Sequence, residues 1–149
     1  MAEYSATEQT INPGESVIFS ITDIPDVTGR IQHRGNSGSF MLAGRSGRRR
    51  RCCCCNRNFA QYLVSFGANI GLPEGGTPGS ISMAIAIDGS TLIDTTMFSN
   101  PSAAETFDNV GRLTYVPIMN NCCQSLSVRN TSAVPITLTY GNLVINRAG

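Results

Sequence analysis

The feature that most constrains the fold is a strict alternation of apolar and small or polar residues between positions 62 and 70. Tyr62, Val64, Phe66, Ala68 and Ile70 alternate with Leu63, Ser65, Gly67 and Asn69. Successive side chains of a β-strand point to opposite faces of its sheet, so this pattern predicts a strand with one buried face. Segment 81–87 repeats the pattern, and the Asp88-Gly89 pair that follows predicts a tight hairpin turn.

Shorter apolar segments separated by turn residues extend this pattern over the rest of the chain. Further strands are expected at 16–19, near 31, and at 39–42, 92–98, 110–119 and 126–128, with a last hairpin of 136–140 and 143–146. Pro117 places its strand at a sheet edge or bulge. Residues 99–109 are expected to be a loop and residues 1–12 a flexible N-terminal arm. About eight strands at a spacing of roughly 8–12 residues predict an all-β fold, a single sandwich or jelly roll over 13–149.

The charge of the chain is concentrated in one loop, at 45–57. The sequence has eleven arginines, ten acidic residues and no lysine. Six arginines lie in this loop: Arg45, Arg48, Arg49, Arg50, Arg51 and Arg57. The remainder is therefore mildly acidic, unlike a uniformly basic nucleic-acid binder. Because no aromatic residue interrupts the arginine run, base stacking is not expected. A solvated basic tip, or one that contacts an acidic neighbour, is the preferred interpretation, with phosphate binding as the alternative.

All six cysteines are expected at one end of the fold. Four follow the arginines and two lie in the predicted turn at 120–123: Cys52, Cys53, Cys54, Cys55, Cys122 and Cys123. Four predicted antiparallel strands separate the two segments, which returns the chain to the same end. Disulfides, within a chain or between neighbouring chains, are one interpretation of these cysteines, and reduced surface thiols are a second. A zinc or iron site using Cys52, Cys54, Cys122 and Cys123 is a third, although four consecutive cysteines cannot all reach one ion.

No arrangement of residues predicts an enzyme or a resident cofactor. His33 is the only histidine and has no nucleophile motif beside it, and Asn130-Thr131-Ser132 is a glycosylation sequon. The N-terminal segment lacks the basic and apolar regions of a secretory signal, and no apolar run of eighteen residues occurs. Synthesis in the cytoplasm and no membrane partner are therefore expected.

Three segments carry a resemblance to a known family: NFAQYLVSF at 58–66, SISMAIAIDG at 80–89 and SLSVRNTS at 125–132. In this order and spacing, over about 38–147, they resemble the jelly-roll domains of the C1q/tumour-necrosis-factor superfamily. The variant that looks most similar is the short one of spore-surface proteins and small phage virion proteins of Gram-positive bacteria. The resemblance implies a homotrimer about a threefold axis, with Tyr62, Phe66, Tyr115 and Tyr140 as candidates for its seam. A collagen-like stem is missing, and the Arg/Cys loop is not a family feature.

These observations lead to one functional hypothesis and two alternatives. The hypothesis is a non-enzymatic bacteriophage structural protein, a trimeric capsid decoration or head-fibre knob on the virion surface. Its partners would be its own copies and a capsid or other particle protein, on which the N-terminal arm docks, and not nucleic acid. One alternative is a carbohydrate- or receptor-binding C1q-like module that contacts surface glycans through loops 71–80 and 99–109. The other is a disulfide-linked structural protein of a spore or cell surface.

Overall fold

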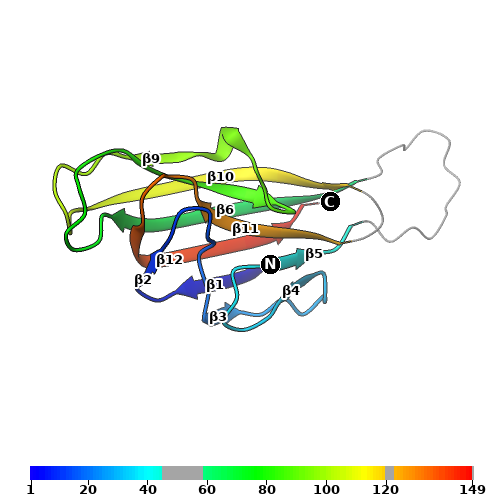
Figure 1. The fold of residues 1–149 in the computed structure, drawn as a ribbon. Coiled ribbons are helices and arrows are strands. Elements are labelled where there is room, and N and C mark those ends of the chain that lie inside the picture. The colour runs from blue at the N-terminus through cyan, green and yellow to red at the C-terminus, as the bar shows by residue number, and fades with distance from the viewer. Residues whose placement is uncertain (45–58, 120–122, 149) are drawn as a thin grey trace, which may run out of the picture.

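The protein is a sandwich of two antiparallel β-sheets (Figure 1). The structure is a computed structural model that describes residues 1–44, 59–119 and 123–148. In these residues sheet A comprises β1 (Ala2–Ala6), β2 (Gln9–Ile11), β3 (Ile21–Ile24), β6 (Phe59–Gly71), β10 (Phe107–Met119) and β12 (Ile136–Arg147). Sheet B comprises β4 (Ile31–His33), β5 (Phe40–Leu42), β7 (Ile81–Ile87), β8 (Ser90–Thr91), β9 (Met97–Ser99) and β11 (Gln124–Asn130). A short 3-10 turn, η1 (Ile93–Thr95), lies between β8 and β9.

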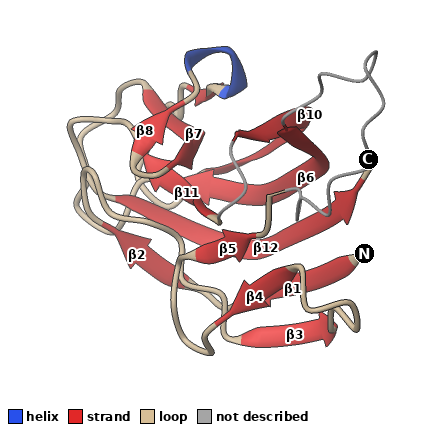
Figure 2. Cartoon of the chain, turned by 90° about the vertical axis from the view of Figure 1, so that its right-hand side faces the viewer, coloured by secondary structure: helices blue, strands red, loops and turns tan. Residues whose placement is uncertain are grey.

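The strand order mixes elements that are far apart in the sequence. Sheet A runs β10-β6-β12-β1-β3, with β2 also paired to β12, and sheet B runs β4-β5-β11-β7-β8, with β9 paired to β7. Figure 2 shows the strands of the two layers from one end of the molecule. No helix in the described part of the chain is long and apolar enough to cross a membrane. The predicted all-β jelly-roll sandwich is confirmed.

The core contains the apolar face that the alternation in β6 predicts. Tyr62, Val64 and Phe66 are at most 1 % exposed, and the buried residues of both sheets form one cluster. Aromatic rings join the layers: the Phe40 ring centroid lies 5.4 Å from that of Phe19, which lies 6.5 Å from that of Phe66. Edge-to-face contacts of this kind add to the free energy gained from burial.

The expectation of a flexible arm over residues 1–12 is wrong. Strand β1 pairs with β12, Ala2 opposite Ile145, and β2 pairs with the other end of β12. Tyr4 is 3 % exposed and Ile11 is 1 % exposed. The composition of residues 1–12 is polar, but alternate residues of the segment are apolar enough to fill the core when β12 lies beside them. An N-terminal arm free to dock on a particle is therefore not available.

Strand β12 is continuous, where the sequence predicted a hairpin that turns at Gly141-Asn142. The pairing of β12 with β6 shifts register between Thr139 and Asn142, which is a β-bulge. Tyr140 has a φ of 51° there, and a Cβ on Gly141 would lie 3.0 Å from the Ala6 side chain. Glycine at this position thus allows close packing of two strands instead of a reversal of the chain.

Smaller differences concern three other predicted strands. Residues 16–19 form only isolated bridges, Ser16 to Arg129 and Phe19 to Ser37, although Phe19 is buried. The return strand predicted at 92–98 is divided by η1 into β8 and β9, which both pair with β7. Strand β10 begins at Phe107, which shortens the predicted loop, and lies at the edge of sheet A as Pro117 indicated.

Candidate functional site

The segments that flank the predicted Arg/Cys end meet at one end of the sandwich. Met119 pairs with Phe59, and Gln124 pairs with Leu42, so the ends of β10 and β5 and the starts of β6 and β11 lie together (Figure 1). The strand-parity argument is thereby confirmed for the flanking strands. Six arginines and five cysteines lie outside the described residues: Arg45, Arg48, Arg49, Arg50, Arg51, Arg57, Cys52, Cys53, Cys54, Cys55 and Cys122.

The cysteine interpretations stay predictions. Cys123, which is described, is exposed and not in a disulfide. Within residues 1–44, 59–119 and 123–148, no group of three His, Cys, Asp or Glu side chains could hold a metal ion. The described residues therefore supply at most one cysteine to any cross-link or metal site.

Two of the four residues predicted for a trimer seam are core residues instead. Tyr62 and Phe66 are 0 % and 1 % exposed, because they share the inward parity of Val64. The Tyr62 hydroxyl donates to the Ala43 carbonyl at 2.7 Å, and burial raises the pKa of this phenol. Neither side chain can contact a second chain. Both act within the fold, so their assignment to a seam is wrong.

The outer face of sheet A presents apolar side chains on its edge strand. Along β10, Val116 and Ile118 are buried, whereas Leu113, Tyr115 and Met119 are 62, 57 and 53 % exposed. Their register places them beside half-buried residues of β6 and β12, since Tyr115 pairs with Leu63 and both Leu113 and Val144 pair with Ser65. We call these five residues the sheet A patch: Leu63, Leu113, Tyr115, Met119 and Val144.

Of the two exposed residues predicted for the seam, Tyr115 belongs to the sheet A patch and Tyr140 lies outside it. Tyr140 is 84 % exposed and lies at the bulge of β12. The sequence interpretation missed Leu113 and Met119, although a signal for them exists. Val110, Val116 and Ile118 occupy even positions of this strand, and Leu113 and Met119 occupy odd ones. Since alternate residues of a strand face opposite sides of the sheet, burial of the first three requires that Leu113 and Met119 point outward.

The other half of the same face is polar. Asn109 donates its side-chain amide to the Asn69 side-chain carbonyl at 3.0 Å, and Asn142 donates to Glu3 at 2.9 Å. Thr137 and Thr139 lie on β12 in the same half, opposite Gly71 and Asn69. The outer face of sheet A thus divides into an apolar half near the start of β6 and a polar half near its end.

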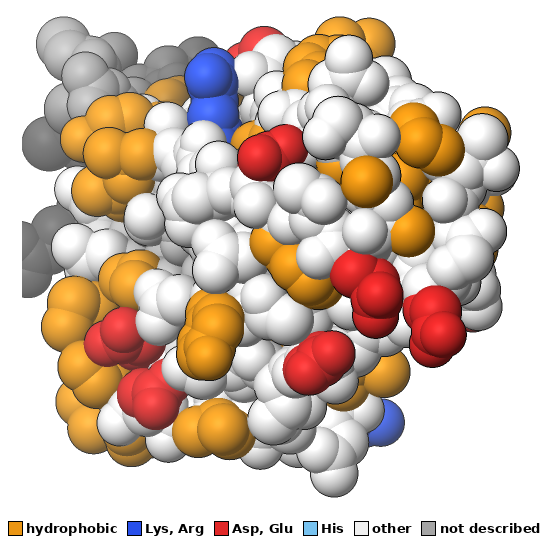
Figure 3. Space-filling model, turned by 90° about the vertical axis from the view of Figure 1, so that its left-hand side faces the viewer, with side chains coloured by type: hydrophobic (Ala, Val, Ile, Leu, Met, Phe, Trp, Pro, Cys, Tyr) orange, Lys and Arg blue, Asp and Glu red, His pale blue; other side chains and the backbone are white. Residues whose placement is uncertain are grey.

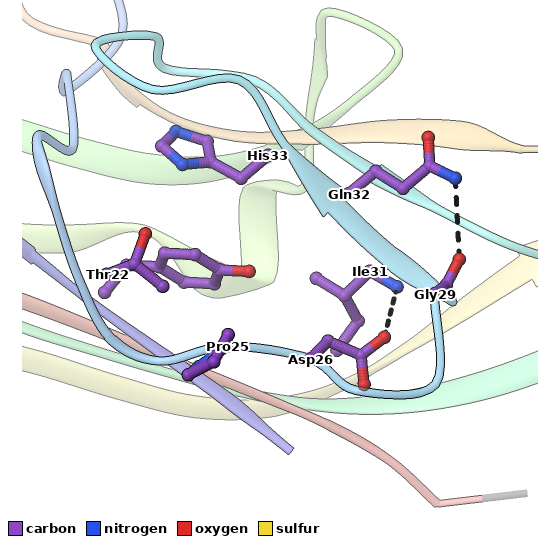
Figure 4. A pocket seen from close by; sticks show the side chains of 8 residues that line it. Thr22, Pro25, Asp26, Gly29, Ile31, Gln32 and His33 are labelled. Carbon is purple, nitrogen blue, oxygen red and sulfur yellow. Dashed lines mark hydrogen bonds between the residues drawn. The ribbon is translucent and has the colours of Figure 1, made fainter.

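A polar pocket opens between the edge strands β3 and β4 (Figure 4). It has a volume of about 410 Å³ and includes Thr22, Asp26 and His33 in its lining. Asp26 accepts hydrogen bonds from the backbone N–H groups of Arg30 and Ile31, at 2.8 and 2.9 Å. Partial burial opposes ionisation of Asp26, but these bonds, together with those from the Thr28 backbone and hydroxyl, outweigh it and lower its pKa. These hydrogen bonds hold the Asp26 carboxylate in place and favour its ionised form, so this side chain stabilises the surrounding loop.

His33 is a structural residue of this pocket. Its ring stacks on Phe40 with centroids 4.3 Å apart, and its Nε2 lies 2.9 Å from the Ser37 carbonyl oxygen. A neighbouring pocket of about 560 Å³ includes His33, Arg34 and Met41 in its lining. Among the described residues that line the first pocket, Tyr4 is the only aromatic side chain besides His33, and at 3 % exposure it offers no open face for stacking on a sugar.

The sequon and the loops proposed as a ligand face also have definite places. Asn130 is 1 % exposed and donates to the carbonyls of Ile11 and Val134, so it is not accessible in the folded chain. Loops 72–80 and 100–106 lie at one end, since Gly71 pairs with Phe107 and Glu105 donates its backbone N–H to Leu72. Figure 3 shows the end at the left of Figure 1, where acidic side chains are scattered among uncharged ones.

The comparisons with known proteins identify the fold. No family profile and no curated protein matches the sequence. Among solved structures, the globular domain of the zebrafish complement 1qA protein is similar with a TM-score of 0.66 and 9 % identity, covering 99 % of this chain and 96 % of that one. The Eiger TNF structure from S. frugiperda is similar with a TM-score of 0.65 and 10 % identity, covering 99 % and 91 %. Murine APRIL is similar with a TM-score of 0.52 and 8 % identity, covering 95 % and 97 %.

These likenesses span nearly the whole of each chain. At such low identity they establish the fold alone. The partners of this chain have to be inferred from its own surface. The chain therefore has the jelly-roll fold of the C1q and tumour-necrosis-factor domains.

Proposed function

We propose that this protein is a non-enzymatic structural subunit that assembles as a homotrimer through the sheet A patch. The observation that carries the proposal is the exposure of Leu113, Tyr115 and Met119 on the edge strand β10. Apolar side chains that cluster on a solvent-exposed surface indicate an interaction site, because covering them releases the water that hydrates them. The patch contains no charged residue.

The lack of charge in the sheet A patch allows a second copy of the same chain to occupy this face. The full chain has eleven arginines and ten acidic residues, a net charge of +1, so two copies do not repel each other strongly. Contact through the uncharged patch brings no like charges together. The polar half of the same face, with Asn69 and Asn109, can then form hydrogen bonds at the rim of the contact. A threefold arrangement is what the resemblance to C1q and tumour-necrosis-factor domains implies.

The finer part of the proposal places this trimer on the surface of a bacteriophage particle, as a capsid decoration or head-fibre knob. Its support is the interpretation of the sequence, in which the short jelly-roll variant of small phage virion and spore-surface proteins looks most similar to this chain. Electron microscopy of particles assembled without this protein tests the placement. A surface feature should disappear from the particle, and unchanged particles would contradict it.

The oligomeric state is tested by native mass spectrometry of the purified chain, prepared without reductant or chelator. A trimer is expected, and a monomer at micromolar concentration would refute the proposed assembly. The same spectrum reports the cysteines, since disulfides lower the mass by the lost hydrogens and bound metal raises it. Binding to a glycan array in the absence of capsid binding would instead favour the carbohydrate- or receptor-binding module.

A further inference from the structure

The outer face of sheet B contains an arginine whose side chain is fixed in place. Arg129 lies on β11, and its Nη1 donates to the Gly89 carbonyl in the β7–β8 turn at 2.8 Å. In the sheet register Arg129 pairs with Ala84, and Ala86 pairs with Thr91. Because the side chains of Ala84 and Ala86 are small, this face has room for the arginine to extend toward the turn.

An open pocket surrounds this guanidinium. Its volume is about 420 Å³, and its lining consists of Gly14, Gly89, Thr91, Arg129, Asn130, Thr131 and Ser132. One wall is the turn at Gly14, which donates its backbone N–H to the Asn130 carbonyl at 2.9 Å. Another part of the lining is the β7–β8 hairpin, whose turn residue Gly89 has a φ of 82°. Because both turn residues are glycines, no side chain of theirs occupies the pocket.

The positive charge of Arg129 has no acidic partner in this lining. The neighbouring Asp88 accepts from the Ser125 backbone at 2.8 Å and from the Gln124 side chain at 2.9 Å. Glu15, next to Gly14, accepts from the Asn12 backbone at 3.2 Å. Asp88 is thus engaged with the start of β11, and Glu15 with its own turn.

The Nε atom of Arg129 is buried and has no hydrogen-bond acceptor among the described residues. A buried N–H without an acceptor destabilises the folded state relative to a satisfied one. The buried Nε is not itself open to a ligand, so what an anion in the pocket would satisfy is the charge of the guanidinium, which has no acidic partner in the lining.

We propose that the Arg129 pocket binds an oxyanion, a carboxylate or a sulfate group. A guanidinium matches such groups in shape, since its N–H donors lie in one plane and can donate to two oxygens at once. The Thr91 hydroxyl adds a donor from the hairpin wall, while the Thr131 hydroxyl is 2.7 Å from that of Ser82 and is already hydrogen-bonded. The site lies on sheet B, so it is independent of the sheet A assembly proposed above.

A nuclear magnetic resonance titration of the full-length protein tests this site. Sodium acetate and sodium sulfate are added at constant ionic strength, with sodium chloride as the reference salt. We expect saturable shifts of the Arg129 Nε–H resonance and of the Gly89 and Thr131 backbone amides with at least one of the two anions. Shifts that rise linearly without saturation for both anions, or that match those in chloride, would overturn the proposal.

Three variants and one matched control assign the binding to this pocket. Arg129→Gln should abolish saturation, and Arg129→Lys should weaken binding about tenfold, because an ammonium retains the charge but not the planar donors. Thr91→Val removes a hydroxyl from an exposed position and should weaken binding several-fold. Arg112→Gln, at an exposed arginine of β10, should leave it unchanged.

Folding of each variant is checked by its circular dichroism melting curve. If Arg129→Gln does not fold, Arg129→Lys and Thr91→Val still decide the outcome. Unchanged affinity in every folded variant, or an equal loss in Arg112→Gln, would refute the assignment. A trimer in native mass spectrometry together with a failed titration would leave the assembly proposal standing and remove this one alone.

Discussion

Replacement of Leu113 by aspartate should convert the proposed trimer to monomers without unfolding the chain. Leu113 is 62 % exposed on β10 and belongs to the sheet A patch. Full burial of a leucine side chain is worth about 1.5–3 kcal/mol, so covering the exposed part contributes roughly 1–2 kcal/mol per subunit. Over three subunits the loss is about 3–6 kcal/mol, or roughly a 10²–10⁴-fold increase in the dissociation constant. Desolvation of the new carboxylate adds to this loss.

The folded monomer should be little affected, because the side chain already faces solvent there. An aspartate at an exposed strand position costs about 1 kcal/mol or less. Sedimentation velocity over a concentration series measures the assembly, and urea denaturation in the monomeric range measures the fold. Ile93→Asp is the matched control, since Ile93 is 85 % exposed in η1 beside sheet B and lies outside the patch.

The reasoning is refuted if Leu113→Asp and the native chain sediment alike as trimers. It is also refuted if Ile93→Asp dissociates the assembly to the same extent, because general surface charge would then explain the effect. Dissociation with a large loss of urea stability would show that Leu113 supports the monomer fold, contrary to its exposure.

Three further predictions concern the fold and its turns. Gly71→Ala should destabilise the chain by about 1–3 kcal/mol, because the added Cβ would lie 2.5 Å from the Thr106 carbonyl oxygen, while Gly79→Ala, with no atom closer than 4.0 Å, should change stability little in urea titrations. Tyr62→Phe should cost about 1–3 kcal/mol in the same assay, because a backbone carbonyl loses its hydroxyl donor. Hydrogen bonds from the Ser125 backbone and the Gln124 side chain lower the pKa of Asp88 below 3.8, so its contribution to stability should be present above pH 3.8 and be lost as pH falls through its lower folded-state pKa. The stability difference between native chain and Asp88→Asn should therefore narrow below about pH 4 in acid titrations followed by circular dichroism.

Each of these results has an opposite that would count against the structure. Equal stability of Gly71→Ala and Gly79→Ala would show that β6 and the loop before β10 are farther apart than described. A constant difference between native chain and Asp88→Asn down to pH 2 would mean that the carboxylate is not the stabilising group. An unchanged Tyr62→Phe variant would remove the link between β6 and the end of β5.

The parts of the fold that could be predicted are those whose local pattern agrees with their final environment. The alternation at 62–70 and 81–87 identified β6, β7 and their inward faces, and the Asp88-Gly89 turn has positive φ at both residues. The edge position of β10 followed from Pro117. These features depend on side-chain parity and backbone geometry, which neighbouring residues already specify.

The candidate sites were less predictable, because they are made of residues from separate strands. Tyr62 and Phe66 were expected at a seam for their aromatic character, but parity places them in the core. The sheet A patch combines Leu113 and Met119 of β10 with Val144 of β12, which is 25 or more positions away in the sequence. The Arg129 pocket combines the turn at Gly14 with the hairpin at Gly89, a proximity that no local pattern encodes.

By itself the sequence determined that the chain is an all-β sandwich, which residues of its main strands face inward, and that the Arg/Cys segment lies between strands. Only the tertiary structure decided that residues 2–11 are core strands, that β12 is continuous through its bulge, and which surfaces remain exposed. The physical reason is that pleat and turn preferences act over a few residues, whereas strand pairing and burial depend on which distant segment lies alongside.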